Sequence, residues 1–293
     1  DQPAYELIES PILYLSIDRE FDLTKRQLLN LRQYIDGGGL FVSNPDLDTR
    51  GVFKSVRQVA EKLYPNLQWI SVPQDHSLRN LYQQTDVPMQ MIHNGIRPLM
   101  IHFERDIGRG LQKNDIGRSQ SFAALSNLYL FMTGKNPRRE RLDVNHVVQM
   151  PKQSLHKIKS ARIRHSGDYN PEPIGLAQIK AILSNDHDVD LDIRTLEAQE
   201  LDPQIKIAFS TTKGDGQLSD QDAAAIRQWV EAGGTLWIDT VGADKNASVV
   251  SSQMLAKIFP KEPLASLTGF NSPIIHGAGL GKGFDNRRIR YRL

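Results

Sequence analysis

The chain repeats itself at a constant offset of 195 residues, and this repeat limits the folds that are open to it. Blocks and single residues align without gaps at that offset. The aligned pairs are Ile12 with Ile207, Leu23 with Leu218, LRQYIDGGG (31–39) with IRQWVEAGG (226–234), EKLYP (61–65) with AKIFP (256–260), and Ser77 with Ser272. Matches at one offset across roughly 65 residues indicate a duplicated structural unit.

Each copy of the unit alternates apolar runs with helical patterns. In the first copy, short apolar runs predict strands and apolar side chains at helical spacing predict helices. The predicted strands lie at 11–17, 39–44 and 67–72, and the predicted helices at 22–36 and 53–65. The first strand, PILYLSI, is expected to be buried. This alternation is typical of parallel β-α-β units, so we expect an α/β fold with a doubly wound parallel sheet in tandem duplication.

The two copies differ at their ends. The second copy opens with elements that the first lacks, and the first closes with elements that the second lacks. These are ARIRHSG (161–167), a helix at 174–184 and a strand at 189–194 in the second copy, and RPLMIHFERDIG (97–108) with a helix at 119–134 in the first. We therefore predict a first copy at 1–134 without its N-terminal strands. A linker follows at 135–160, and then a second copy at 161–293 without its C-terminal strand and helix. Truncation at both termini, with neighbouring domains of a longer chain, is the simplest explanation; the alternative is that another segment or chain completes the first copy.

The composition excludes several classes of function. A net charge of +2 gives no reason to expect a nucleic-acid partner, and no apolar run is long enough to span a membrane. The basic segment NPRRERL (136–142) is interpreted as a solvated linker, with phosphate or partner binding as the alternative. The chain contains no cysteine, which excludes disulfides, thiolate metal sites and cysteine nucleophiles. Localisation stays open between bacterial periplasmic or membrane-associated and cytoplasmic, because cysteine-free chains suit either.

The order of motifs resembles a known family. PILYLS, LR.YI..GGGLF, LYP and DHSL follow one another in the first copy, and the second copy contains ARIRHSGDYNPEP. This order resembles the bacterial domain-of-unknown-function family 4159, of the class I glutamine amidotransferase-like superfamily. HNGIRPLMIHFERDIG resembles the closing pattern of that family. The resemblance implies a flavodoxin-like three-layer fold and implies no reaction.

The resemblance also raises the question of a nucleophile. In amidotransferases of this superfamily, the strand after the glycine pair ends in a tight turn that presents a cysteine. Here the corresponding residues are Ser43 and Asn44 in the first copy and Asp239 and Thr240 in the second. Glutamine hydrolysis through a cysteine is therefore excluded. Ser43 would need a base, from His76, His93 or His102, and Asp239 is interpreted as a turn or cap residue.

Polar residues follow the predicted strands, where open parallel sheets gather ligands. In the first copy these residues are Asp18, Asp46, Asp48, Asp75, His76 and Asp106. Asp75, His76 and Asp106 are candidate catalytic residues. Asp18, Asp46, Asp48 and Asp239 are candidate ligand-binding residues. If they converge, carboxylates and an imidazole could hold a divalent cation or a sugar. The metal is left unknown, and we expect no cofactor.

Two glycine-containing segments remain. HSGDYNPEP (165–173) has a single glycine, which is not a phosphate-binding loop. GAGLGKGF (277–284) is interpreted as a flexible loop, with anion binding through Lys282 as the alternative.

Two functions from different classes stay open. The first is a non-catalytic amidotransferase-like module that binds a small ligand or a protein within a larger bacterial protein. The second is a hydrolase that could act on sugars and that uses Asp75, His76 and Asp106. Convergence of these three residues in one cleft would favour the hydrolase.

Overall fold

The computed structural model of the chain describes residues 2, 4–8, 10–133, 147–151, 154–241, 245–262 and 264. The basic segment at 136–142 and the glycine-rich segment at 277–284, with Lys282, lie outside the described residues. By contacts the chain divides into two compact units: Asp1–His156 with Glu172–Asp190, and Lys157–Pro171 with Leu191–Leu293. The predicted domains follow the sequence repeat instead, and the two divisions differ at Glu172–Asp190, a segment of the second copy that the contacts group with the first unit.

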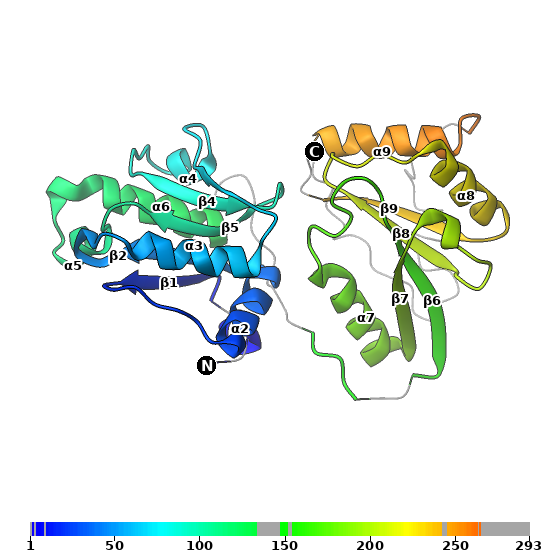
Figure 1. The fold of residues 1–293 in the computed structure, drawn as a ribbon, viewed down its shortest axis with the longest axis horizontal. Coiled ribbons are helices and arrows are strands. Elements are labelled where there is room, and N and C mark those ends of the chain that lie inside the picture. The colour runs from blue at the N-terminus through cyan, green and yellow to red at the C-terminus, as the bar shows by residue number, and fades with distance from the viewer. Residues whose placement is uncertain are drawn as a thin grey trace. The chain divides into compact units, whose positions relative to one another are not determined.

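The first unit is built on a five-stranded sheet in the order β1-β2-β5-β4-β3 (Figure 1). The strands are β1 (Ile12–Ile17), β2 (Leu40–Pro45), β3 (Trp69–Ser71), β4 (Met89–His93) and β5 (Pro98–Phe103). The α-helices of the first copy are α1 (Ala4–Leu7), α2 (Lys25–Asp36), α3 (Val52–Leu63), α4 (Ser77–Asn80), α5 (Gly108–Gln112) and α6 (Ser119–Thr133). Two short 3-10 helices, η1 (Asp46–Asp48) and η2 (Ile116–Arg118), lie between them.

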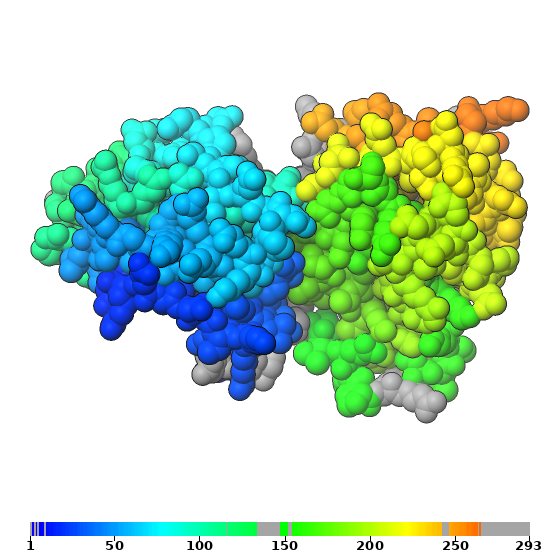
Figure 2. Space-filling view, viewed as in Figure 1, coloured from blue at the N-terminus to red at the C-terminus, as the bar shows by residue number. Residues whose placement is uncertain are grey.

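Helices cover both faces of this sheet, and alternate residues of β2 show how. Phe41 packs in one core cluster with the buried faces of α2 and α3. Its neighbour Val42 packs in the other cluster with α6, because successive side chains of a strand point to opposite faces. In the space-filling view of Figure 2, the atoms of the α3 region lie at the surface of the first unit.

The prediction of a wholly parallel sheet is wrong for the first unit. β1–β2 and β2–β5 are parallel, but β4 runs antiparallel to both β3 and β5. β4 was not predicted. It joins β5 through the Asn94–Arg97 turn, in which Gly95 has a φ of +91°. Four residues are too few for the crossover that a parallel pair requires. An Asn-Gly pair between apolar runs is a hairpin signal, so the sequence did contain this information.

The expectation that the first strand is buried is also only partly met. β1 forms one edge of the described sheet, and Tyr14 keeps 40% of its surface exposed. Its apolar composition therefore reflects the residues that face the helices rather than burial on all sides.

The second sheet has the order β7-β6-β8-β9, and its β6–β8 and β8–β9 pairs are parallel. Its strands are β6 (His156–Ile163), β7 (Val189–Leu196), β8 (Ile207–Thr212) and β9 (Thr235–Thr240). The helices of the second copy are α7 (Ile174–His187), η3 (Ala198–Glu200), α8 (Asp220–Glu231) and α9 (Lys245–Ile258). No helix in the described part of the chain is long and apolar enough to cross a bilayer.

The double glycines make the same structure in both copies. Gly38 and Gly233 have φ values of +107° and +98°, a conformation that glycine adopts without strain. The next glycine in each copy lies against an aromatic ring: a Cβ on Gly39 would lie 2.3 Å from the Tyr34 ring, and one on Gly234 would lie 2.2 Å from the Trp229 ring. The first glycine of each pair thus turns the chain out of the helix, and the second leaves room for the ring.

Side-chain hydrogen bonds repeat as well. Thr24 and Ser219 each cap a helix through a capping box. Arg32 donates to the carbonyl of Leu63, and its counterpart Arg227 donates to the carbonyl of Ile258. Partners at both ends of each bond are related by the 195-residue offset, so the two copies share a structure as well as a sequence pattern.

Candidate functional site

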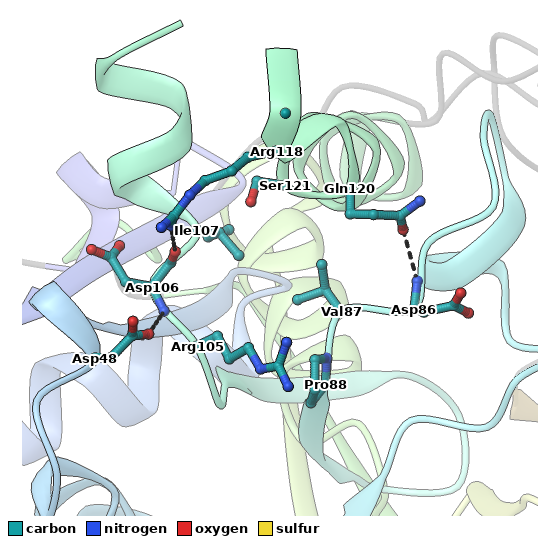
Figure 3. Close-up of a pocket in the computed structure, with 11 residues that line it drawn as sticks. Asp48, Asp86, Val87, Pro88, Arg105, Asp106, Ile107, Arg118, Gln120 and Ser121 are labelled. Carbon is teal, nitrogen blue, oxygen red and sulfur yellow. Dashed lines mark hydrogen bonds between the residues drawn. The ribbon is translucent and has the colours of Figure 1, made fainter. Parts of the chain in front are cut away.

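A pocket lies beyond the carboxyl ends of β2 and β5 in the first unit (Figure 3). Its volume is about 540 Å³. It is lined by Asp48, Asp86, Val87, Pro88, Arg105, Asp106, Ile107, Gly117, Arg118, Gln120 and Ser121. These residues come from the turn after β2, the segment before β4, the turn after β5 and the start of α6. Ligands of open α/β sheets bind at this edge.

A hydrogen-bond network joins the turn after β2 to the turn after β5. The buried Asn44 donates from Nδ2 to Asp106 Oδ1 (3.0 Å), and its Oδ1 accepts from the Ile107 amide (2.9 Å). The Leu47 amide donates to Asp106 Oδ2 (3.0 Å), and the Asp106 amide donates to Asp48 Oδ1 (2.7 Å). The network therefore holds one wall of the pocket in a single arrangement.

The turn after β2 is strained. Leu47 and Asp48 have φ values of +52° and +56°, in the left-handed region. This conformation costs a non-glycine residue roughly 1–2 kcal/mol. The Leu47 side chain is 67% exposed, so burial does not stabilise this conformation. The two hydrogen bonds to Asp106 and Asp48 offset the strain instead.

Asp106 serves as an acceptor in this network. Burial acts to raise the pKa of its carboxyl, but hydrogen bonds from Asn44 and from the Arg109, Leu47 and Gly108 amides outweigh burial and lower the pKa. The carboxylate is thus charged and its oxygens are engaged by protein donors. A general base works best when its pKa lies near the working pH, so the lowered pKa makes this carboxylate a weak base.

The structure brings together three of the predicted aspartates. Asp48 and Asp106 line the pocket, and Asp46 lies in the same turn as Asp48. Burial and the charges of Asp106 and Asp46 raise the pKa of the Tyr14 hydroxyl to about 12. Tyr14, on β1, thus lies close enough to both carboxylates to interact with them electrostatically.

The other predicted residues of the first copy do not line the pocket. Asp75 is exposed, and Asp18 bonds to its exposed neighbour Arg19. His76 caps α4, because its Nδ1 accepts from the Leu78 amide (3.1 Å); burial lowers the pKa of its imidazole. Among the described residues, no three histidine, aspartate or glutamate side chains are arranged to hold a metal ion.

Ser43 does have a histidine partner. Ser43 Oγ lies 2.9 Å from His102 Nδ1, across the β2–β5 pair. Both residues are buried, at 0% and 3% exposure, and the His102 ring stacks on Phe53 at 4.3 Å. Burial lowers the pKa of His102 to about 4. The pair lies inside the core, where no substrate can reach the hydroxyl, so it stabilises the sheet rather than attacking a substrate.

Of the residues that line the pocket, only Asp48 and Asp106 were predicted, and those that the sequence analysis missed include Arg105, Arg118 and Ser121. Arg105 makes no hydrogen bond or ion pair with any residue that the structure describes. With the described residues, Arg118 makes only long contacts, from Nη1 to the Asp106 carbonyl (3.5 Å) and from Nε to Asp115 (3.8 Å). Arg105 precedes Asp106 at a strand end, which was a usable signal. Ser121 had none, because it is one serine on a mostly apolar helix.

The second unit differs at the equivalent position. Asp239, the counterpart of Asn44, lies on β9, and burial raises the pKa of its carboxyl. The segment after β6 is held by internal bonds: His165 Nε2 lies 2.7 Å from the Thr211 carbonyl, and the Gly167 amide donates to His165 Nδ1 (3.1 Å). Asp168 pairs with Lys213 at 3.4 Å. These contacts tie neighbouring loops together.

No curated protein matches the chain. Two segments, residues 3–126 and residues 159–276, match the same family, described as Domain of unknown function (DUF4159). The two segments correspond to the two copies found in the repeat, and together they include most of the chain. The chain therefore belongs to the DUF4159 family, whose domain it contains twice.

Proposed function

We propose that this chain is a non-catalytic module that binds a small ligand in the pocket of its first unit. One observation carries the proposal. The pocket offers hydrogen-bond donors that have no partner among the described residues, on Arg105 and Ser121, while Asp106, the predicted catalytic residue that lines it, is engaged by the protein itself. Its volume of about 540 Å³ is typical of small-molecule sites.

We also propose that each copy is a flavodoxin-like domain of the class I glutamine amidotransferase-like superfamily. The parallel β1–β2–β5 portion of the sheet, the helices on both faces and the strained turn after β2 support this assignment. The turn follows Ser43 and Asn44, at the location where that superfamily presents its nucleophile. Because the chain has no cysteine nucleophile, the proposed role of this site is ligand binding without catalysis.

The hydrolase alternative places its chemistry on Asp75, His76 and Asp106. Asp106 is the predicted catalytic residue that lines the pocket, and its carboxylate accepts hydrogen bonds from Asn44 Nδ2 and from backbone amides. Asp75 and His76 do not line the pocket. These contacts favour binding over hydrolysis.

A thermal-shift panel of sugars, carboxylates, nucleotides and divalent metals tests the proposal. A ligand at 100 times its dissociation constant stabilises the folded state by about 2.7 kcal/mol, which is a shift of a few degrees. Ser121→Phe, which fills the pocket, is expected to abolish the shift. Asp75→Ala, at an exposed position outside the pocket, is the matched control and should keep it.

Two outcomes would contradict the proposal. A shift that survives Ser121→Phe but disappears in Asp75→Ala would move the site to the residues of the hydrolase alternative. Conversion of the bound compound during incubation, followed by NMR, would show catalysis.

A further inference from the structure

We propose that the pocket binds a small monocarboxylate that also carries hydroxyl or ammonium groups, with its carboxylate on Arg105, Arg118 and Ser121. This inference rests on the proposed function and names the chemical class of the ligand.

Ser121 is the first observation. It is 8% exposed, yet its hydroxyl makes no hydrogen bond with any residue that the structure describes. Figure 3 shows the hydroxyl directed into the pocket. The oxygen is not one of the described polar atoms that are sealed in the core without a partner, so it is open to the pocket and available to a ligand. A ligand atom that bonds to this hydroxyl would supply the partner that the protein does not.

Two guanidinium groups share the pocket with this hydroxyl. Arg105 is without a partner among the described residues, and Arg118 has only the contacts at 3.5 and 3.8 Å. Five N–H donors in a planar fork match the two oxygens of a carboxylate. The backbone amide of Gly117, in η2, is already engaged, since it donates to Asp115 Oδ1 at 3.0 Å. The side chains therefore supply the anion contacts.

The acidic residues of the pocket restrict the rest of the ligand. Asp48, Asp86 and Asp106 set three negative charges against the two arginines, a formal charge of −1. Such a pocket disfavours a phosphate dianion. Asp106 is engaged in the network, but the side chain of Asp86 bonds to no described residue, and Asp48 uses only Oδ1. These acceptors call for hydroxyl or ammonium donors on the same ligand.

Matched pairs of compounds test the inference by calorimetry and thermal shift on the whole chain. The pairs are gluconate with sorbitol and glucuronate with glucose, and glucose 6-phosphate is the dianion. We expect the carboxylates to bind at least about tenfold more tightly than their neutral partners and than the phosphate. Arg105→Ala should weaken carboxylate binding about tenfold or more, and Ser121→Ala should weaken it to a smaller extent.

Arg26→Ala is the control, because it removes one exposed cation from α2, which does not line the pocket. Equal binding of sorbitol and gluconate, both abolished by Ser121→Phe, would overturn the carboxylate assignment and leave the proposed function standing. No binding by either carboxylate, or binding that Arg105→Ala leaves unchanged, would also overturn the assignment. Failure of every compound in the wider panel would overturn the proposed function as well.

Discussion

At the scale of single residues, the chemistry of this protein depends on which polar groups are already satisfied. Ser43 and His102 resemble the serine and histidine of a catalytic triad, but they lie opposite each other on neighbouring strands and are buried. Ser43 Oγ also lies 3.2 Å from the Ile101 carbonyl, so its proton has an acceptor within the sheet. A neutral imidazole is needed here, since a charged one would lie in the core without a carboxylate partner.

We therefore predict a loss of stability in acid that depends on His102. Burial lowers the pKa of His102 to about 4, so between pH 6.5 and 4 the unfolded chain takes up a proton that the folded chain does not. The free energy of unfolding should fall with decreasing pH in that window, by about 1.4 kcal/mol per pH unit from this site. The lowered pKa of His76 acts in the same direction.

Urea unfolding of the wild type and of His102→Gln at pH 7, 5.5 and 4.5 measures the contribution of His102. His102→Gln is expected to be less stable than the wild type at pH 7, because it loses the ring stacked on Phe53. The difference should narrow as the pH falls. The exposed His156→Gln serves as control and should follow the wild type. A difference for His102→Gln that stays constant with pH would contradict the burial of a neutral imidazole.

At the scale of elements, the same local cap begins the corresponding helix of each copy. Thr24 precedes α2 and accepts from the Gln27 amide (3.3 Å), while the Thr24 amide donates to Gln27 Oε1 (2.9 Å). Ser219 and Asp222 repeat this pattern at α8, with Asp222 N to Ser219 Oγ at 3.0 Å. Reciprocal caps satisfy amides that would otherwise lack a partner in the first turn.

Removal of either cap should have a similar effect. We expect Thr24→Ala and Ser219→Ala each to lower the free energy of unfolding of its own unit by about 1 kcal/mol, measured by chemical denaturation. The double variant should show the sum, because the two positions share no partner. Ser252→Ala, at an exposed position inside α9, is the control and should change stability by less than about 0.5 kcal/mol. A loss at one helix alone would mean that the duplicated caps are not equivalent.

At the scale of the whole molecule, duplication has not produced two equivalent sites. Asn44 connects β2 to the turn after β5 in the first unit, and its counterpart Asp239 lies on β9, the last strand of the described second sheet. Val42 is fully buried under α6, whereas its counterpart Trp237 is 58% exposed. The described part of the second unit thus contains no counterpart of β5 and no counterpart of α6, the two elements that complete the pocket in the first unit.

We therefore predict one binding site per chain. Calorimetric titration with gluconate should give a stoichiometry near one, despite the two copies of the family domain. Asn44→Asp, which introduces the residue of the second copy next to Asp106, should weaken binding because two carboxylates would then meet where an amide now donates. Asn80→Asp, at an exposed position on α4, controls for the added charge. Two sites of equal affinity would contradict the asymmetry.

Local chemistry made much of the fold predictable. Periodicity identified α2, α3 and α6 and the strands β1, β2 and β5 within a few residues, because each pattern reports which side of one element is apolar. The repeat identified the duplication, and the paired glycines identified the turns, because Gly38 and Gly39 are required by a backbone angle and by one nearby ring.

The pocket was decided by tertiary structure. Strand direction depends on pairing between distant segments, so β4 emerged as an antiparallel neighbour of β5 only in the fold. Likewise, Asp106 is an engaged acceptor because Asn44, 62 residues away, donates to it, and the Ser121 hydroxyl has no partner among the described residues because it faces the pocket. By itself the sequence determined the elements and their duplication, since those follow from neighbours along the chain. Which polar groups are satisfied and which are free to bind was decided by contacts across the fold, since hydrogen bonds and burial depend on groups that only folding brings together.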